Sequence, residues 1–152
     1  SNGVIPNVQS NFDRDLFNTF RSFINHKNFF PKHYRNNSDE RGSFVELARL
    51  ETGGQVSFSS TKPGITRGNH FHTRKIERFS VIKGKALIQI RKIGTEEVIE
   101  FYLDGENPAY VDMPVWYTHN IINNSNEEVL YTNFWINEPY DPKNSDTYFI
   151  EV

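Results

Sequence analysis

The chain has 152 residues, with 13 Phe, 7 Tyr, no cysteine and a formal net charge of −2. This length suits one domain with a substantial core, and the slight acidity argues against a nucleic-acid binder that relies on phosphate neutralisation. No apolar run approaches the roughly 20 residues of a membrane span and no signal-peptide pattern opens the chain, so we expect a cytoplasmic protein that binds no membrane. The absence of cysteine excludes disulfides and thiolate metal ligands.

Residues 1–42 are predicted to form a linker and one helix. Residues 1–10 show no periodicity, and Ser10 or Asn11 could cap a helix of about 13 residues. Its apolar stripe consists of Phe12, Leu16, Phe20, Phe23 and Ile24. We expect this amphipathic helix to cover one end of the domain or a partner subunit. Residues 26–42 are polar and are predicted to be irregular.

Residues 43–152 are predicted to form a β-domain with a C-terminal tail. Short strands separated by turn residues are expected at 44–50, 55–60, 86–92, 97–103, 110–113, 118–123 and 129–136, with further strands around residues 64–84. Eight or more such strands indicate an all-β antiparallel sandwich or barrel. Residues 137–152 are predicted to be a polar tail whose apolar stretch 148–150 packs back on the domain.

A His-x-His pair, His70 and His72, gives the chain a candidate metal site. Alternate residues of a strand point to the same side, so both imidazoles are expected to face one direction. Glu77 follows after a short polar segment, and His119 lies in a later strand. Three imidazoles and one carboxylate suit a divalent ion such as Zn, Fe, Ni or Mn, with a position left for water or substrate.

The spacing of these residues resembles the two cupin motifs. Gly64-x5-His70-x-His72-x4-Glu77-x6-Gly84 matches the first motif at every defined position. Pro114-x-Trp116-x2-His119-x3-Asn123 is similar to the second motif, with Trp116 where glycine is usual and Gly105 separated from Pro114 by eight residues rather than five. The resemblance implies a cupin double-stranded β-helix, a small jelly-roll barrel, preceded by the helix.

Strand parity selects two candidates for proton transfer near the metal. Tyr117 is expected to point to the same side as His119, and Lys75 to the same side as Glu77. Either could remove a proton next to a carbonyl group that the metal polarises. The alternative roles are a core tyrosine and a solvated lysine.

A closer resemblance covers nearly the whole chain from about residue 11. The segments LFNTFRSF, DERGSF, GITRGNHFHTRKIERF, VWYTHNI and NEPYDPKNSDTYFIEV resemble the C-terminal cupin domain of CapF-type bifunctional enzymes of capsular polysaccharide synthesis. This resemblance implies a zinc-dependent epimerase that acts at C3 of a UDP-linked 4-keto-6-deoxy-N-acetylhexosamine, on the route to UDP-N-acetyl-L-fucosamine. It also implies that His70, His72, Glu77 and His119 are the zinc ligands and that cupins of this kind are commonly homodimers.

The substrate residues follow from phosphate chemistry and from position. Arg67, Arg74 and Arg78 could pair with the diphosphate, because guanidinium groups match phosphate oxygens. Arg67 is favoured, since Arg78 should face away from the side of Glu77, and Asn69 is assigned with Arg67 to substrate binding.

No Gly-x-Gly-x-x-Gly fingerprint occurs, so we expect no NAD(P) site in this chain. The family's short-chain reductase domain would then precede these residues in a longer protein or belong to a separate chain. Other functions remain open at this point. They are a 3,4-ketoisomerase or another metal-cupin enzyme on nucleotide sugars, an iron-dependent dioxygenase, and a non-catalytic sugar-binding cupin.

Overall fold

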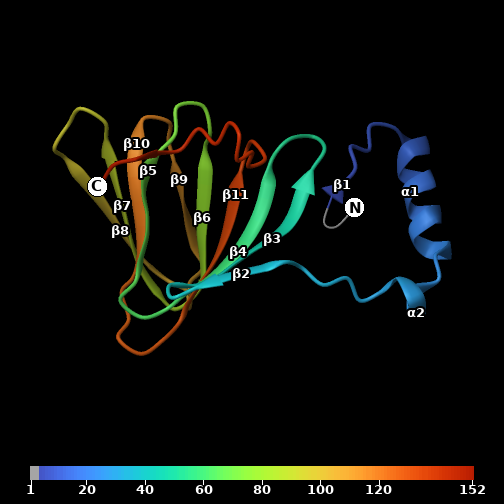
Figure 1. Ribbon diagram of the computed structural model, residues 1–152, viewed down its shortest axis with the longest axis horizontal. Helices are drawn as coiled ribbons and strands as arrows, with labels where there is room; N and C mark the ends of the chain where they lie inside the picture. Colours follow the sequence, from blue (N-terminus) through green and yellow to red (C-terminus); the bar gives the residue numbers. More distant parts are fainter. Residues whose placement is uncertain (1–3) are drawn as a thin grey trace.

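A computed structural model describes residues 4–152 and consists mainly of two facing β-sheets (Figure 1). Its elements are β1 (Val4–Ile5), α1 (Asn11–Phe23), α2 (His26–Phe29), β2 (Asn36–Asp39), β3 (Gly42–Leu50), β4 (Gln55–Thr61), β5 (Thr66–Phe71), β6 (Glu77–Lys83), β7 (Lys85–Lys92), β8 (Val98–Asp104), β9 (Ala109–Met113), β10 (Tyr117–Asn123), β11 (Leu130–Ile136) and β12 (Tyr148–Phe149). The larger sheet has the order β1-β3-β4-β11-β6-β9, with β2 also paired to β3. The smaller sheet has the order β12-β5-β10-β7-β8. The all-β jelly-roll architecture with a preceding helix, predicted from the sequence, is confirmed.

The apolar core lies between the two sheets. Ala86, Ile88 and Ile90 of β7 alternate with more exposed neighbours, and Phe79 and Val81 of β6 belong to the same buried cluster. Alternation of this kind directs every second side chain of a strand inward. Each fully buried valine, isoleucine or phenylalanine side chain contributes about 1.5–3 kcal/mol relative to an exposed one. The core therefore fixes the register of the strands that carry the candidate site.

The inner face of β4 is polar, in contrast to this core. Gln55, Ser57, Ser59 and Thr61 are all buried. The Ser59 hydroxyl lies 2.9 Å from the hydroxyl of Thr132, its partner on β11. Buried hydroxyls need such partners because an unsatisfied polar group is costly away from water. The interior of the barrel is thus apolar on one side and polar on the side next to β3.

A β-bulge in β5 changes which side chains face the interior. The register between β5 and β10 shifts at Asn69, whose φ is 59°. The preceding Gly68 has φ 101°, and a Cβ there would lie 2.7 Å from the carbonyl oxygen of His119. The extra residue brings Arg67 and His70, three positions apart, opposite residues that are two positions apart on β10. Both side chains therefore lie on the inner face of the sheet.

Helix α1 has the predicted cap and amphipathic pattern. Ser10 accepts a hydrogen bond from the Asp13 amide, and the Asp13 carboxylate accepts one from the Ser10 amide, which forms a capping box. None of its residues is buried, and Phe23 is 86% exposed. In Figure 1 the helix stands apart from the barrel. Within residues 4–152, neither helix has the length and apolar character that a membrane span requires.

Two strands lie in stretches that we expected to be linker or irregular chain. β2 is exposed at all four positions and pairs with β3 through the turn at residues 40–41. Its sequence, Asn-Asn-Ser-Asp, lacks the apolar alternation that indicates a strand. The strand forms through backbone pairing with β3 alone, so the sequence pattern did not predict it. β1 is a two-residue parallel pair with β3. The expected division of the chain after residue 42 stays a prediction.

The C-terminal tail packs back on the barrel as predicted. Tyr148 and Phe149 form β12, opposite Phe71 and His70 of β5. The Tyr148 and Phe71 rings are stacked with their centroids 5.2 Å apart. The tail therefore borders the strand that carries the histidine pair.

Candidate metal centre

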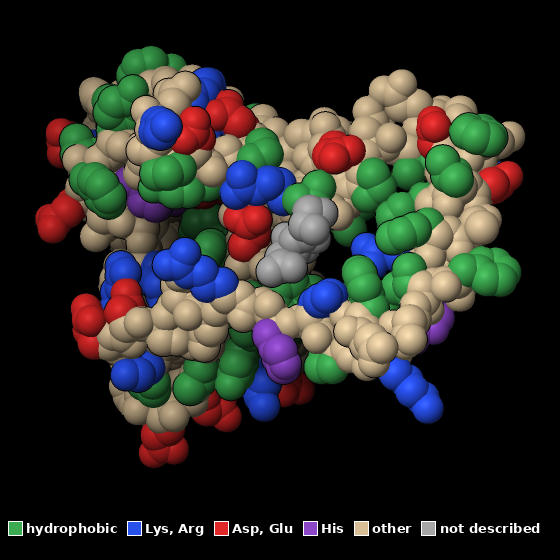
Figure 2. Space-filling model, turned by 45° about the vertical axis from the view of Figure 1, so that its right-hand side comes forward, with side chains coloured by type: hydrophobic (Ala, Val, Ile, Leu, Met, Phe, Trp, Pro, Cys, Tyr) green, Lys and Arg blue, Asp and Glu red, His purple; other side chains and the backbone are tan. Residues whose placement is uncertain are grey.

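Three histidines and one glutamate from three parts of the sheet framework meet in the barrel. His70 lies on β5, His72 follows that strand, Glu77 begins β6 and His119 lies on β10. One ligand atom from each side chain lies within 4.8 Å of all the others. The Nε2 atoms of His119, His72 and His70 lie 3.0, 3.3 and 3.7 Å from Oε2 of Glu77. On the face drawn in Figure 2, histidine side chains form part of the wall of a hollow.

Hydrogen bonds to backbone carbonyls orient two of the imidazoles. Nδ1 of His72 donates to the carbonyl oxygen of Asp146, and Nδ1 of His119 donates to that of Tyr117 at 3.2 Å. A carbonyl can only accept, so each Nδ1 atom carries a proton, and Nε2 is the nitrogen through which either ring could bind a metal ion. Nε2 of His72 is buried and has no hydrogen-bond partner within residues 4–152. This is the usual arrangement of histidines that bind a metal.

The charges of the cluster favour an ionised glutamate among imidazoles. Burial alone would raise the pKa of the Glu77 carboxyl, but the three surrounding imidazoles outweigh it and hold this pKa well below its usual range. Burial lowers the pKa of His119 in spite of the Glu77 carboxylate. Burial also opposes protonation of His72, but Glu77 and the Asp146 carbonyl raise its pKa. Glu77 therefore supplies one negative charge at neutral pH.

The four side chains fit a divalent first-row metal ion. Three imidazole nitrogens and one carboxylate match the donors that such ions take. The buried Nε2 of His72, without a hydrogen bond, is an atom that a metal ion would satisfy. The structure brings together all four residues that the sequence predicted as ligands, and their binding of a metal stays a prediction.

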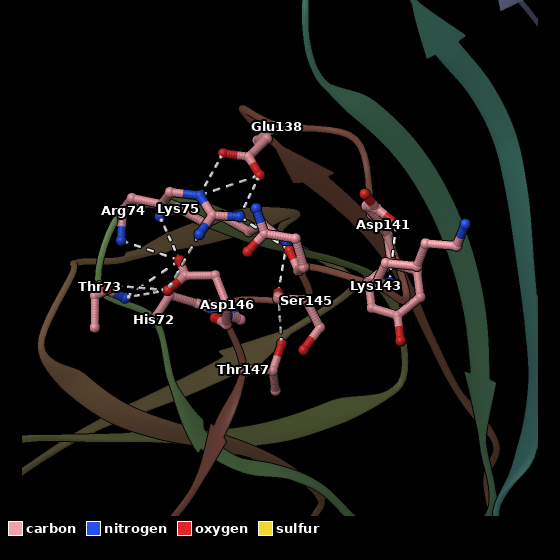
Figure 3. A network of polar contacts seen from close by, with 12 residues as sticks. His72, Thr73, Arg74, Lys75, Glu138, Asp141, Lys143, Ser145, Asp146 and Thr147 are labelled. Atoms are coloured by element: carbon pink, nitrogen blue, oxygen red, sulfur yellow. Dashed lines mark hydrogen bonds and ion pairs between the residues drawn. The ribbon is translucent and has the colours of Figure 1, made fainter.

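Asp146 ties the C-terminal segment to the loop between the ligands (Figure 3). Its carboxylate accepts hydrogen bonds from the amides of Thr73, Arg74 and Lys75 at 3.0–3.3 Å and from the Thr73 hydroxyl at 2.6 Å. Burial opposes its ionised form, but these hydrogen bonds lower its pKa to about 2. With its carbonyl on His72, Asp146 fixes both the first ligand strand and the turn that leads to Glu77.

Sequence reasoning did not single out Asp146. It is an isolated acidic residue in a polar tail, and no spacing rule connects it to the histidine pair 74 positions earlier. Its φ of 47° is unusual for a residue other than glycine. A long-range contact of this kind is visible only in the folded chain.

The turn before His119 explains the departure from the second cupin motif. Trp116 has φ 65°, in the left-handed region that glycine adopts most readily. Its amide donates to the carbonyl of His72 at 2.8 Å, and its ring lies 5.7 Å from the Phe71 ring. The turn keeps the conformation that glycine would favour, and it is anchored to a predicted ligand.

The two predicted proton-transfer residues have different surroundings. Tyr117 lies two positions before His119 on the same face of β10 and packs partly buried against the core. Lys75 is 2% exposed, but its Nζ donates to the carbonyl of Ser145 at 2.7 Å and lies over the Tyr140 ring. Their catalytic roles stay predictions, and only Tyr117 shares a strand face with a cluster residue.

The predicted substrate residues lie on opposite faces of β5. Arg67 is on the inner face, where its guanidinium donates to the Thr61 hydroxyl at 3.0 Å and to the Ser60 carbonyl at 3.2 Å. The Asn69 side chain accepts a hydrogen bond from Asn120, which alternates with the inward-facing His119 and so lies on the outer face. The role of both in substrate binding stays a prediction.

The other two arginines considered for the diphosphate form ion pairs. Arg74 pairs with Glu138 at 2.8 Å, and Arg78 pairs with Asp112 at 2.7 Å. A guanidinium that already faces a carboxylate is less available to a phosphate group. The structure therefore leaves Arg67 as the strongest of the three candidates.

Comparison with known proteins finds relatives that match nearly the whole chain. The chain is 38% identical over 148 residues to the UDP-2-acetamido-2,6-beta-L-arabino-hexul-4-ose reductase of Pseudomonas aeruginosa, covering 95% of this chain and 38% of the relative. A crystal structure of the capsular polysaccharide assembling protein CapF from Staphylococcus aureus superposes with a TM-score of 0.91 and 42% identity, over 98% of this chain and 40% of that one. The resemblance to CapF-type proteins is thus confirmed.

Two further findings delimit the match. The cupin domain of Cnp3 from Schizosaccharomyces pombe has a TM-score of 0.53 at 14% identity, over 68% of this chain and 69% of that one, and supports the fold alone. This chain spans about two fifths of the length of its Pseudomonas and Staphylococcus relatives. The model of the polysaccharide biosynthesis C-terminal domain family matches residues 37–148, and the chain therefore belongs to this family.

Proposed function

We propose that this domain is a metal-dependent C3-epimerase in the synthesis of capsule or surface polysaccharide precursors. Its substrate is a UDP-linked 4-keto-6-deoxy-N-acetylhexosamine, from which it removes the proton next to the C4 ketone. The observation that carries the proposal is the cluster of three imidazoles and one carboxylate, all within 4.8 Å of one another. The name of the Pseudomonas relative supports the substrate class, since it specifies a UDP-linked hexul-4-ose.

The proposed metal is Zn²⁺, held by His70, His72, Glu77 and His119. Manganese, iron and nickel suit the same donors. When bound, the cation would supply a Lewis acid that polarises the C4 carbonyl and so makes the C3 proton acidic. The anionic Glu77 offsets part of the cation's charge, and the carbonyl partners of His72 and His119 hold both Nε2 atoms toward it.

Tyr117 is the better supported of the two candidates for moving the C3 proton. It lies on the same face of β10 as His119 and two positions away, so its phenol is within reach of a sugar bound beside the cluster. Lys75 remains the second candidate, but its ammonium would first have to leave the Ser145 carbonyl. An epimerisation needs one residue that takes the C3 proton from one face of the sugar ring. A second group then returns a proton to the other face.

The domain is proposed to work with a reductase and as a homodimer. The short-chain reductase would reduce the C4 ketone of the epimerised sugar, either from another domain of the same protein or from a separate chain. The exposed apolar residues of α1 support a second subunit as the partner of that helix.

Hydrogen exchange at C3 tests the proposal directly. The UDP-4-keto sugar is incubated with the metal-loaded protein in deuterium oxide, and the C3 proton is followed by NMR. We expect this proton to be lost, and His119→Ala or removal of the metal by a chelator to abolish the exchange. His33→Ala is the matched control, because His33 is exposed and lies outside the cluster.

Three results would count against the function. Absence of exchange with bound metal would favour a sugar-binding module. Oxygen consumption would favour a dioxygenase, and migration of the keto group from C4 to C3 would favour a ketoisomerase. Each outcome is read from the same reaction mixture.

A further inference from the structure

A cavity distinct from the metal cluster opens where β2, β3 and β5 meet. It has a volume of about 580 Å³, and none of the four clustered side chains lines it. Its lining consists of Arg35, Asn36, Asn37, Ser38, Asp39, Arg41, Phe44 and Arg67. This volume is within the range of small-molecule sites, which run from about 300 to 1,000 Å³.

The cavity carries an excess of positive charge. Its lining holds three guanidinium groups and one carboxylate, which gives a net charge of 3 − 1 = +2. The carboxylate of Asp39 is already bound to Arg41, with Oδ2 2.9 Å from Nε. Arg35 is exposed and makes no hydrogen bond or ion pair through its side chain within residues 4–152. Within the described residues, two of the three guanidinium groups are therefore left without a carboxylate partner.

Arg67 is the most constrained of these groups. Its two acceptors, the Thr61 hydroxyl and the Ser60 carbonyl, are both neutral, and the described residues give it no ion pair. Burial, followed by the nearby Arg41 guanidinium, lowers the pKa of Arg67. A partly buried cation held by neutral acceptors is destabilised until an anion approaches it. The two hydrogen bonds hold the guanidinium in place for such an anion.

The position of Arg67 relates this cavity to the metal cluster. Because of the bulge in β5, Arg67 and His70 face the same interior. They are three residues apart, so they are separated along the strand by no more than about 10 Å. In a UDP-linked 4-keto sugar, the pyrophosphate is attached to C1, across the hexose ring from the keto carbon C4.

We propose that this cavity binds the pyrophosphate of the nucleotide-sugar substrate, with Arg67 at its centre and Arg35 and Arg41 beside it. The inference rests on the proposed function for the identity of the substrate. A pyrophosphate diester carries two negative charges, equal to the excess positive charge of the cavity. Guanidinium groups bind phosphate oxygens in pairs, which also sets the orientation of the sugar toward the cluster.

Calorimetric titration with UDP tests the site without requiring any turnover. The wild-type protein is titrated with UDP, with inorganic pyrophosphate and with uridine, which lacks phosphate. We expect UDP and pyrophosphate to bind and uridine not to bind detectably. Arg67→Ala is expected to weaken UDP binding at least tenfold, and Arg67→Lys by less, because lysine keeps the charge but loses the paired hydrogen bonds.

Two further variants separate binding from folding. Arg35→Ala removes an exposed side chain and should weaken UDP binding severalfold while the thermal denaturation midpoint stays unchanged. Arg21→Ala, on α1 and outside the lining of the cavity, is the matched control and should leave UDP binding intact. UDP that binds equally to the wild type, Arg67→Ala and Arg35→Ala overturns the proposal, as does a wild type that does not bind UDP at millimolar concentration.

The exchange assay distinguishes this inference from the proposed function. If UDP binding depends on Arg67 but no C3 exchange occurs, the pyrophosphate site stands and the epimerase function fails. If exchange proceeds and its KM is unchanged in Arg67→Ala, the function stands and the pyrophosphate site fails.

Discussion

The two ends of β5 lie in surroundings of opposite charge. At the His70 end, a partly buried carboxylate is surrounded by three imidazoles, and the tail fixes the neighbouring loop through Asp146. At the Arg67 end, a guanidinium is held by neutral oxygens, and the cavity has more positive than negative groups. The first end is organised to receive a cation and the second to receive an anion. In the proposed arrangement, one strand would provide two complementary parts of a site for a ligand with a carbonyl at one end and phosphates at the other.

Removing the carboxylate at the His70 end is expected to have the largest effect. Glu77→Gln keeps the shape of the side chain but removes the negative charge among the imidazoles. Zinc affinity, measured by competition with a chelating dye, should fall by more than about 100-fold. This is a larger loss than is typical when a residue that only hydrogen-bonds to a metal ligand is changed. Glu97→Gln, on an exposed loop, should not change it. Equal zinc affinity in both variants would contradict the metal assignment.

Tyr117→Phe separates chemistry from metal binding at the same end. If the phenol moves the C3 proton, its loss should slow deuterium exchange by about 100-fold. The zinc content should remain that of the wild type, because the His119 contact uses the backbone carbonyl of Tyr117. An unchanged exchange rate would remove Tyr117 from the mechanism and leave Lys75 as the candidate.

Lys75 provides a companion measurement. Lys75→Met should mainly lower the thermal denaturation midpoint, because it removes the hydrogen bond to Ser145 that helps to hold the tail. A loss of exchange as large as that of Tyr117→Phe, without a loss of stability, would instead assign the base to Lys75.

Asp146→Ala tests how much the His70 end depends on its tail. The change removes a carboxylate that accepts hydrogen bonds from three consecutive amides, so the loop between His72 and Glu77 should loosen. We expect zinc affinity to fall by about 10-fold or more. Asp141→Ala, an exposed residue of the same segment, is the control. If both variants bind zinc as the wild type does, Asp146 has no positioning role.

The smallest effect is expected for an arginine that is already paired. Arg78 forms an exposed ion pair with Asp112 and lies over the Tyr110 ring. Arg78→Ala should lower the free energy of unfolding by no more than about 1 kcal/mol in chemical denaturation and leave UDP binding unchanged. A loss of UDP binding as large as that of Arg67→Ala would contradict the inference that an arginine in an ion pair is less available to phosphate than Arg67.

Much of this site could be predicted from the sequence because its signals are local. The histidine pair needs only the two-residue period of a strand, and its spacing to Glu77 matches a known motif. The position of Asn69 was harder to predict. Simple alternation cannot place it, because the bulge reverses the parity of β5 between Arg67 and His70. Asp146 was missed since its role arises from a contact between distant segments.

The bulge in β5 has a consequence for transferring this chemistry to another scaffold. Deleting the single extra residue would rotate every side chain on one side of it by half a turn, and the cationic and histidine groups would then point in opposite directions. A designer who copied the individual ligands onto a regular strand would obtain one half of the site without the other. The irregularity itself has to be copied, together with the glycine that makes it sterically feasible.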